Sequence, residues 1–201
     1  VPHEGVPERV VQRDEGEEAA SKRAWIRLLD RFAGVVPDPW LSSDPKEQRL
    51  FGEIRNDLPA LVNEQVARNG FRKVGTDMAV PEEKGQEMFL FYFQLLKEAG
   101  VDYVVFGHLG DQHLHVNLLP RSQEEFDRSK VLYDRMAQKA IALGGTISAE
   151  HGIGKIRIPY LRQMVGQEGL KQMACVKLAL DPHGILSPGN IIPMQLLKEV
   201  G

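Results

Sequence analysis

The segment GHLGDQHLHVN, residues 107–117, holds three histidines, an aspartate and an asparagine within eleven positions. Neutral imidazole is a ligand that suits divalent zinc, manganese or iron. A turn on Gly110-Asp111 would let the strand that leaves His108 return with His115, so that these two imidazoles lie at neighbouring strand ends. The spacing therefore predicts that His108 and His115 bind one divalent metal ion.

A second segment, SAEHGIGK at 148–155, supplies the groups that such a metal site still needs. Glu150 offers a carboxylate as third ligand, which would leave an open coordination position for a substrate. His151 stands beside it as a free base, and Lys155 as a nearby cation. Glycines in and before the segment permit a close approach of backbone to ligand. A lone histidine is more often structural, and it is the pairing of the two segments that favours a site.

The elements around the histidines must form a hairpin for this site to exist. Residues 101–108 are rich in β-forming side chains and lead directly into the histidine segment. The segment that follows alternates, with His113, His115 and Asn117 on one face of a strand and apolar side chains on the other. This pattern predicts two antiparallel strands whose polar face carries the candidate ligands.

The remaining pattern is mostly helical. Helices are predicted over 15–32, 44–69, 82–100, 122–143 and 168–180, with a strand-like segment over 70–81 that Pro81 ends. Helices and strands mix without a strict βαβ repeat, which predicts an α+β fold with a mainly antiparallel sheet, containing ferredoxin-like elements and covered by helices. We expect residues 1–43 to form an N-terminal helix and linker, and residues 44–201 to form the main domain.

Composition limits the classes of function. The 201 residues are 42% hydrophobic, with a net charge of −3 and no basic stripe, so nucleic acid is not an expected partner. The longest apolar runs are far too short to cross a bilayer. One cysteine, Cys175, excludes an internal disulfide and suits a reducing compartment; it is expected to be a small core residue. The expected location is cytoplasmic, with peripheral association at the inner face of the membrane left open.

Four segments together resemble one protein family. VGTDMAVP, GHLGDQHLHVN, GGTISAEHGIGK and LALDPHGILSPGN stand at the spacing seen in the C-terminal domain of FAD-linked oxidases of the D-lactate, D-2-hydroxyglutarate and glycolate dehydrogenase type. The similarity covers about residues 50–192. It is specific for the domain and much less specific for the substrate.

The resemblance implies a role for each matching position. It makes His108, His115 and Glu150 the ligands of a divalent metal, with zinc or manganese favoured. His151 matches the proposed base of the family. The side chains that would bind substrate are Asn117, which contacts it, and Arg55 and Lys73, which hold its carboxylate.

The same resemblance implies a flavin that this chain does not bind alone. FAD would lie mainly in a separate N-terminal domain, in cis or in trans, while Gly152, Gly154 and Asn190 approach the cofactor. The chain would be the cap that binds a small D-2-hydroxy acid while hydride passes from its Cα to FAD. The electron acceptor is unassigned, and a homo-oligomer is left open.

The sequence departs from the family pattern at one place. Gln112 and His113 stand where the family has Gly-Asn, so the turn loses a residue that adopts a positive φ easily. His113 shares a strand face with His115, roughly 7 Å away along the strand. It is expected to donate a hydrogen bond to substrate, or to be a polar neighbour at the edge of the site.

Two other functions remain open. The same ligands could activate a water in a stand-alone metal-dependent hydrolase. Alternatively, the chain could be a non-catalytic module that binds an organic acid.

Overall fold

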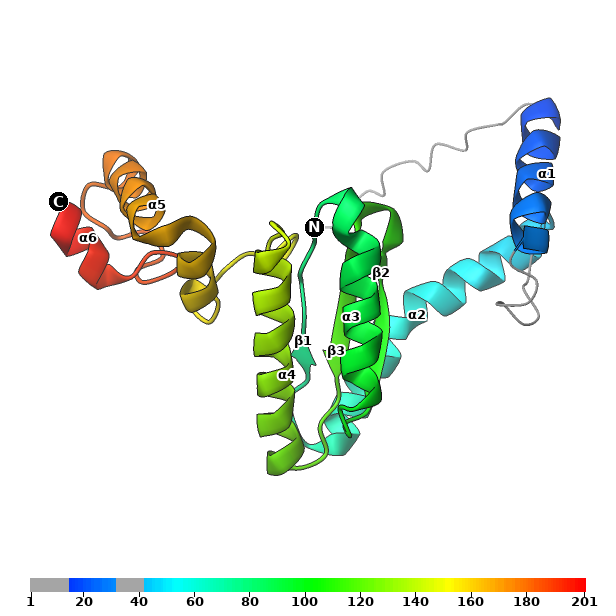
Figure 1. The fold of residues 1–201 in the computed structure, drawn as a ribbon, viewed down its shortest axis with the longest axis horizontal. Coiled ribbons are helices and arrows are strands. Elements are labelled where there is room, and N and C mark those ends of the chain that lie inside the picture. The colour runs from blue at the N-terminus through cyan, green and yellow to red at the C-terminus, as the bar shows by residue number, and fades with distance from the viewer. Residues whose placement is uncertain (1–14, 32–41) are drawn as a thin grey trace, which may run out of the picture. The chain divides into compact units, whose positions relative to one another are not determined.

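The computed structural model describes residues 15–31 and 42–201 (Figure 1). In chain order its elements are α1 (Glu15–Arg31), α2 (Pro45–Asn69), β1 (Val74–Gly75), η1 (Glu82–Lys84), α3 (Gly85–Lys97), β2 (Tyr103–His108), η2 (Leu109–Asp111), β3 (His113–Leu118), α4 (Gln123–Ala142), α5 (Ile158–Leu180) and α6 (Met194–Val200). Two compact units divide between Asn56 and Asp57, and each is described by itself.

The first unit contains α1 and the start of α2. Asp44 caps α2, because its Oδ1 accepts a hydrogen bond of 2.7 Å from the backbone N–H of Lys46, and Pro45 occupies the first helical position. The predicted start of this helix is therefore confirmed. The helix continues through Pro59 to Asn69. Phe32, the last residue of the first predicted helix, lies outside the described residues.

The second unit is built on a small antiparallel sheet in the order β1-β3-β2. The hairpin of β2 and β3 pairs His108 with His113 at its turn and Tyr103 with Leu118 at its open end. On the other side of β3, Gly75 of β1 pairs with Asn117. An α+β fold with an antiparallel sheet is thus confirmed.

The strand predicted over 70–81 is much shorter than expected. Only Val74 and Gly75 form a strand, because Thr76 then uses its side chain in the ladder. Its Oγ1 accepts from the N–H of Val116 at 2.9 Å and donates to the carbonyl of Leu114 at 3.2 Å. Ladder pairing ends there, and the backbone returns to the sheet in an isolated bridge at Ala79.

One face of the sheet carries the hydrophobic core, covered by α3 and α4 (Figure 1). The apolar side chains of β3 are buried as the alternation predicted. They pack with α3 and α4 in a cluster that includes Leu114, Val116, Leu118, Met88, Tyr92, Leu96, Met136 and Ala140. The opposite face of β3 is also buried, and it carries the histidines.

Helix α4 begins and ends as predicted. Ser122 caps it by accepting a hydrogen bond from the N–H of Glu125 at 3.1 Å, while Glu125 accepts from the N–H of Arg121. Leu143 follows the last helical turn, and Gly144 takes the left-handed conformation that ends it.

A second, smaller core lies in α5 and α6. Helix α5 is interrupted at Gly166, which has φ 69° and ψ 179°. The helix predicted over 168–180 is the part after this kink, and a further helical segment precedes it. The sequence patterns did not predict α6, which packs with α5 around Leu161, Leu170, Ala174, Ile192, Leu196 and Leu197. Cys175 lies on the exposed face of α5, so its prediction as a core residue is wrong.

Among the described helices, none is both long and apolar enough to cross a membrane.

Two leucines of α3 test where the core lies. Leu96 is 3% exposed and Leu90 is 63% exposed, on the same helix. Leu96→Ala should lower the free energy of unfolding by about 2–5 kcal/mol, because it opens a cavity, whereas Leu90→Ala should change it by less than about 1 kcal/mol. Urea denaturation of both variants measures this difference. Equal losses would contradict the packing of α3 on the sheet.

Candidate metal and substrate site

The turn of the β2–β3 hairpin brings three imidazoles together. His108 ends β2 and pairs with His113, which begins β3 on the same face as His115. The ring centroids of His113 and His115 lie 4.3 Å apart, and those of His108 and His115 lie 6.3 Å apart. The predicted juxtaposition of His108 and His115 is therefore present in the structure.

Gln112 closes this turn in a left-handed conformation. Its φ is 51° and its ψ 35°, values that a glycine adopts easily and that strain other residues by roughly 1–3 kcal/mol. The turn therefore keeps a positive φ at this position although the glycine of the family pattern is replaced. Space for the Gln112 side chain comes from Gly85 at the start of α3, where an added Cβ would lie only 1.7 Å from Gln112 Oε1.

Glu150 comes from the loop after α4 and lies among the imidazoles. Its Oε1 is 3.1 Å from His108 Nε2 and 3.5 Å from His113 Nδ1, and its Oε2 is 3.7 Å from His115 Nε2. Two donors bound to one tetrahedral ion at about 2.1 Å lie about 3.4 Å apart. The spacing of His108, His115 and Glu150 therefore fits one divalent ion, and one ligand atom from each lies within 4.8 Å of the others.

A backbone carbonyl orients His115. Its Nδ1 lies 3.2 Å from the carbonyl oxygen of Thr76 in a buried position. Because a carbonyl only accepts, Nδ1 carries the proton and Nε2 presents its lone pair toward Glu150. Metal-binding histidines commonly have this arrangement, in which a second partner fixes the tautomer.

Asp77 anchors the loop that carries Glu150 and His151. Its carboxylate is fully buried and accepts hydrogen bonds from Ser148 Oγ at 2.6 Å and from the backbone N–H groups of His151 at 2.9 Å and Glu150 at 3.3 Å. Burial alone would raise the pKa of Asp77, but the hydrogen bonds from Ser148 and His151 outweigh it and hold the pKa below its usual value. The carboxylate is therefore ionised, and it ties this loop to the sheet.

Arg157 completes the anchor from the start of α5. Its Nη1 lies 3.5 Å from Asp77 Oδ2 and donates to Ser148 Oγ at 3.2 Å and to the carbonyl of Gly152 at 2.6 Å. Sequence reasoning missed Asp77, Ser148 and Arg157. The acidic residue in VGTDMAVP was a visible signal, since a carboxylate within an otherwise apolar run is costly to bury without partners.

His151 is the most exposed member of the cluster. Its side chain is 60% exposed, its ring stacks on His115 at a centroid distance of 5.3 Å, and its Nδ1 lies 3.6 Å from Asp77 Oδ1. Nε2 lies 3.9 Å from Glu150 Oε2. His151 thus stands beside the candidate ligands with one face open to an incoming molecule.

Of the predicted substrate residues, Asn117 is buried in the sheet, whereas Lys73 and Arg55 are exposed. Asn117 is buried on the polar face of β3, and its Nδ2 lacks a hydrogen-bond partner among the described residues. An added Cβ at Gly75 would lie 3.0 Å from Asn117 Oδ1, so the glycine leaves room for this amide. Lys73 is exposed just before β1, and Arg55 is exposed on α2 in the first unit. The contacts that gather the cluster involve neither Lys73 nor Arg55.

The predicted cofactor residues lie in two adjoining segments. Gly152 and Gly154 have φ values of 75° and 60°, and the carbonyl of Gly154 accepts a hydrogen bond of 3.0 Å from the N–H of Ile191. Asn190 Oδ1 lies 4.0 Å from where a Cβ of Gly154 would stand. The structure thus places Asn190 near Gly154, and Gly152 and Gly154 lie in the same loop as Glu150.

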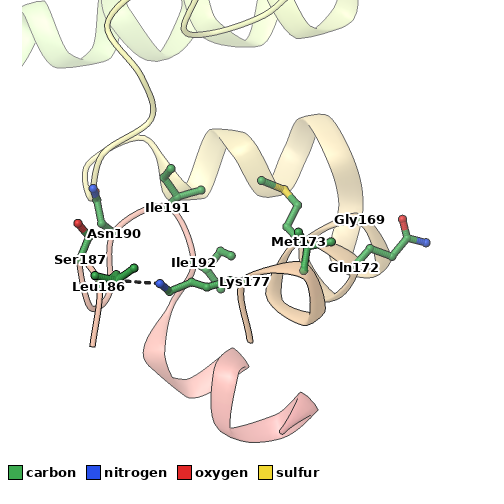
Figure 2. Close-up of a pocket in the computed structure, with 10 residues that line it drawn as sticks. Gly169, Gln172, Met173, Lys177, Leu186, Ser187, Asn190, Ile191 and Ile192 are labelled. Carbon is green, nitrogen blue, oxygen red and sulfur yellow. Dashed lines mark hydrogen bonds between the residues drawn. The ribbon is translucent and has the colours of Figure 1, made fainter. Parts of the chain in front are cut away.

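A cavity of about 580 Å³ lies between α5 and the segment 186–192 (Figure 2). Its walls are mostly apolar, with Met173, Val176 and Ile192 among them, and Lys177 donates to the carbonyl of Leu186 at its rim. Asn190 is the one predicted site residue among its lining residues. No sequence pattern predicted this cavity, since its walls come together only through tertiary packing.

Comparison with known proteins identifies the family of this chain. The profile of the family FAD linked oxidases, C-terminal domain, matches residues 12–191. The chain belongs to this family.

Curated relatives carry three enzyme names. The chain is 33% identical to glycolate oxidase subunit GlcD of Bacillus subtilis over 62% of its length, and 37% identical to D-lactate dehydrogenase of Anaerostipes hadrus over 57%. It is 31% identical to D-2-hydroxyglutarate dehydrogenase of Xanthomonas citri over 89%. It spans 27%, 25% and 37% of these relatives, respectively.

The charge of Asp77 gives a pH-dependent prediction. A carboxyl with a lowered pKa stabilises the fold above its unfolded value of 3.8, and this contribution is lost as the pH falls through the folded value. At neutral pH, Asp77→Asn should cost about 2 kcal/mol or more, because it removes charge-assisted hydrogen bonds. The difference from wild type should shrink below pH 3.8, where Asp77 itself becomes protonated.

Urea denaturation at several pH values measures this difference. Asp57→Asn, at an exposed position of α2, serves as the control and should leave the free energy of unfolding close to the wild-type value at each pH. A loss for Asp77→Asn that stays constant from neutral to acidic pH would rule out the anchoring role of the ionised carboxylate.

Proposed function

We propose that this chain is the substrate- and metal-binding domain of a flavin-dependent D-2-hydroxy acid dehydrogenase. In this proposal the domain extends over residues 44–201, after an N-terminal segment 1–43, and an FAD-binding domain in cis or in trans completes the enzyme. One observation carries the proposal: His108, His115 and Glu150 lie at metal-ligand spacing, with His151 exposed beside them. The family and the names of the relatives support the same class of reaction.

The chain would hold the metal through His108 Nε2, His115 Nε2 and the carboxylate of Glu150. Zinc or manganese suits this set of nitrogen and oxygen donors. When bound, the ion supplies Lewis-acid polarisation of the substrate hydroxyl, and FAD accepts hydride from Cα. The carbonyl of Thr76 keeps His115 in the tautomer that a ligand needs.

His151 would take the hydroxyl proton of the substrate at Nε2. Its Nδ1 lies toward the ionised Asp77, which favours a proton on Nδ1 and leaves Nε2 free to accept. A positive imidazole formed in this step would be stabilised by the same carboxylate. His151 is thus held by Asp77 at two points, the side chain and the backbone N–H.

Polar side chains would orient the acid. The buried Nδ2 of Asn117, which has no hydrogen-bond partner among the described residues, would donate a hydrogen bond to an oxygen of the substrate. Arg55 would anchor a carboxylate through its planar fork of donors, with Lys73 as a second cation. Gly152, Gly154 and Asn190 would approach the flavin, where the positive φ of both glycines permits a close approach of the backbone.

Two variants of the FAD-containing protein test the proposal. His151→Asn should lower kcat with D-2-hydroxy acids by a factor of about 10²–10⁴ while metal content stays at the wild-type level, because the base is lost and the ligands remain. His115→Ala should lose both metal and activity. Elemental analysis and steady-state kinetics on lactate, glycolate and 2-hydroxyglutarate give both readouts.

A matched histidine provides the control. His183 is exposed in the turn after α5, and His183→Ala should keep metal and activity. Wild-type protein without metal, or activity that survives in His151→Asn, would overturn the proposed roles of the metal ligands and of the base. Hydrolysis by the isolated chain that depends on added metal would favour a hydrolase instead.

A further inference from the structure

We propose that His113 is a third imidazole ligand of the same metal ion, which makes the site one of three histidines and one glutamate. This assignment rests on the proposed function, which includes the metal site, and differs from the expectation that His113 would donate a hydrogen bond to substrate. It concerns the position at which this chain departs from its family.

Spacing is the first argument for His113 as a ligand. Its Nδ1 lies 3.5 Å from Glu150 Oε1, the same oxygen that lies 3.1 Å from His108 Nε2. Donors on a tetrahedral ion lie about 3.4 Å apart, so His113 Nδ1 lies at ligand spacing from Glu150. One ligand atom of His113 also lies within 4.8 Å of one from His115. The hairpin explains this placement. Its register pairs His113 directly with His108, and strand alternation puts His113 on the same face of β3 as His115.

The second argument is the other ring nitrogen of His113. Nε2 is buried and has no hydrogen-bond partner in the described part of the chain, yet it lies 3.3 Å from Asp77 Oδ1. A small rotation of the ring would let Nε2–H donate to this carboxylate. The tautomer with its proton on Nε2 leaves the lone pair of Nδ1 directed at Glu150, as in the carboxylate–histidine–metal arrangement of many sites.

Burial separates a ligand from a substrate contact. His113 is 2% exposed, whereas the expected ligands His108 and Glu150 are about half exposed and His151 is more exposed still. His113 is therefore the most buried imidazole of the cluster and offers little surface to a substrate. His115 is also buried.

A third imidazole changes the metal preference that follows from the donor set. Three nitrogens and one carboxylate favour zinc, whereas manganese prefers sites rich in oxygen. His113→Asn, which restores the residue common in the family, should weaken zinc binding about tenfold or more, since even the loss of an outer-shell partner commonly costs 10- to 100-fold. Manganese binding should change less.

Cadmium-113 NMR of histidine-labelled chain counts the ligands directly. Each coordinated nitrogen-15 shows a coupling to the bound cadmium, so wild type should show three coupled imidazoles, His113 among them through Nδ1. His113→Asn should show two, and the control His183→Asn should keep three. Zinc and manganese affinities, measured by chelator competition on the same proteins, give the second readout.

The outcomes separate this inference from the proposed function. Coupling from His108 and His115 but not from His113 in wild type overturns the inference and leaves the proposed site intact. No bound metal in wild type overturns both. The count in wild type needs no substitution, so it decides the question even where His113→Asn fails to fold.

Discussion

The buried carboxylate of Asp77 is the interaction on which the site depends. Asp77 follows β1 by two residues. Its carboxylate accepts hydrogen bonds from the side chain of Ser148 and from the backbone N–H groups of Glu150 and His151. These side-chain contacts add to the backbone pairing of Ala79 with Thr146 and to the hydrogen bond from the N–H of Ala149 to the carbonyl of Asp77, which also hold the loop between α4 and α5. An ionised group in this position is costly to bury, and its several donors, together with Arg157, offset that cost.

Exposure increases across the cluster from this anchor outward. Asp77 and His113 are buried, His108 and Glu150 are half exposed, and His151 is the most open. The site therefore has a buried polar floor and an exposed side formed by His108, Glu150 and His151. In the proposed enzyme the substrate would enter from that side, where Gly154 and Asn190 would approach the flavin. A buried floor would favour catalysis, since ligands and base would be positioned before the substrate arrives.

The hairpin was predictable because its signals are local. Alternation in HLHVNL fixes which side chains share a face, and the SQEE segment fixes the start of α4 through one side-chain hydrogen bond. Asp77 was not predictable in the same way, since its partner Ser148 is 71 positions away. The shortness of β1 depends on the hydroxyl of Thr76 replacing a backbone partner, and the exposure of Cys175 depends on which face of α5 packs on α6. These outcomes are set by tertiary packing, which overrides local pattern.

Anomalous diffraction from crystals of the zinc-loaded chain, recorded on both sides of the zinc edge, would locate the metal directly. We expect one strong peak between His108, His115 and Glu150, within about 2.0–2.2 Å of a donor atom of each. The same map shows whether His113 Nδ1 also binds the ion. A peak at His183 or at surface carboxylates alone, with none at the hairpin turn, would contradict the proposed metal site.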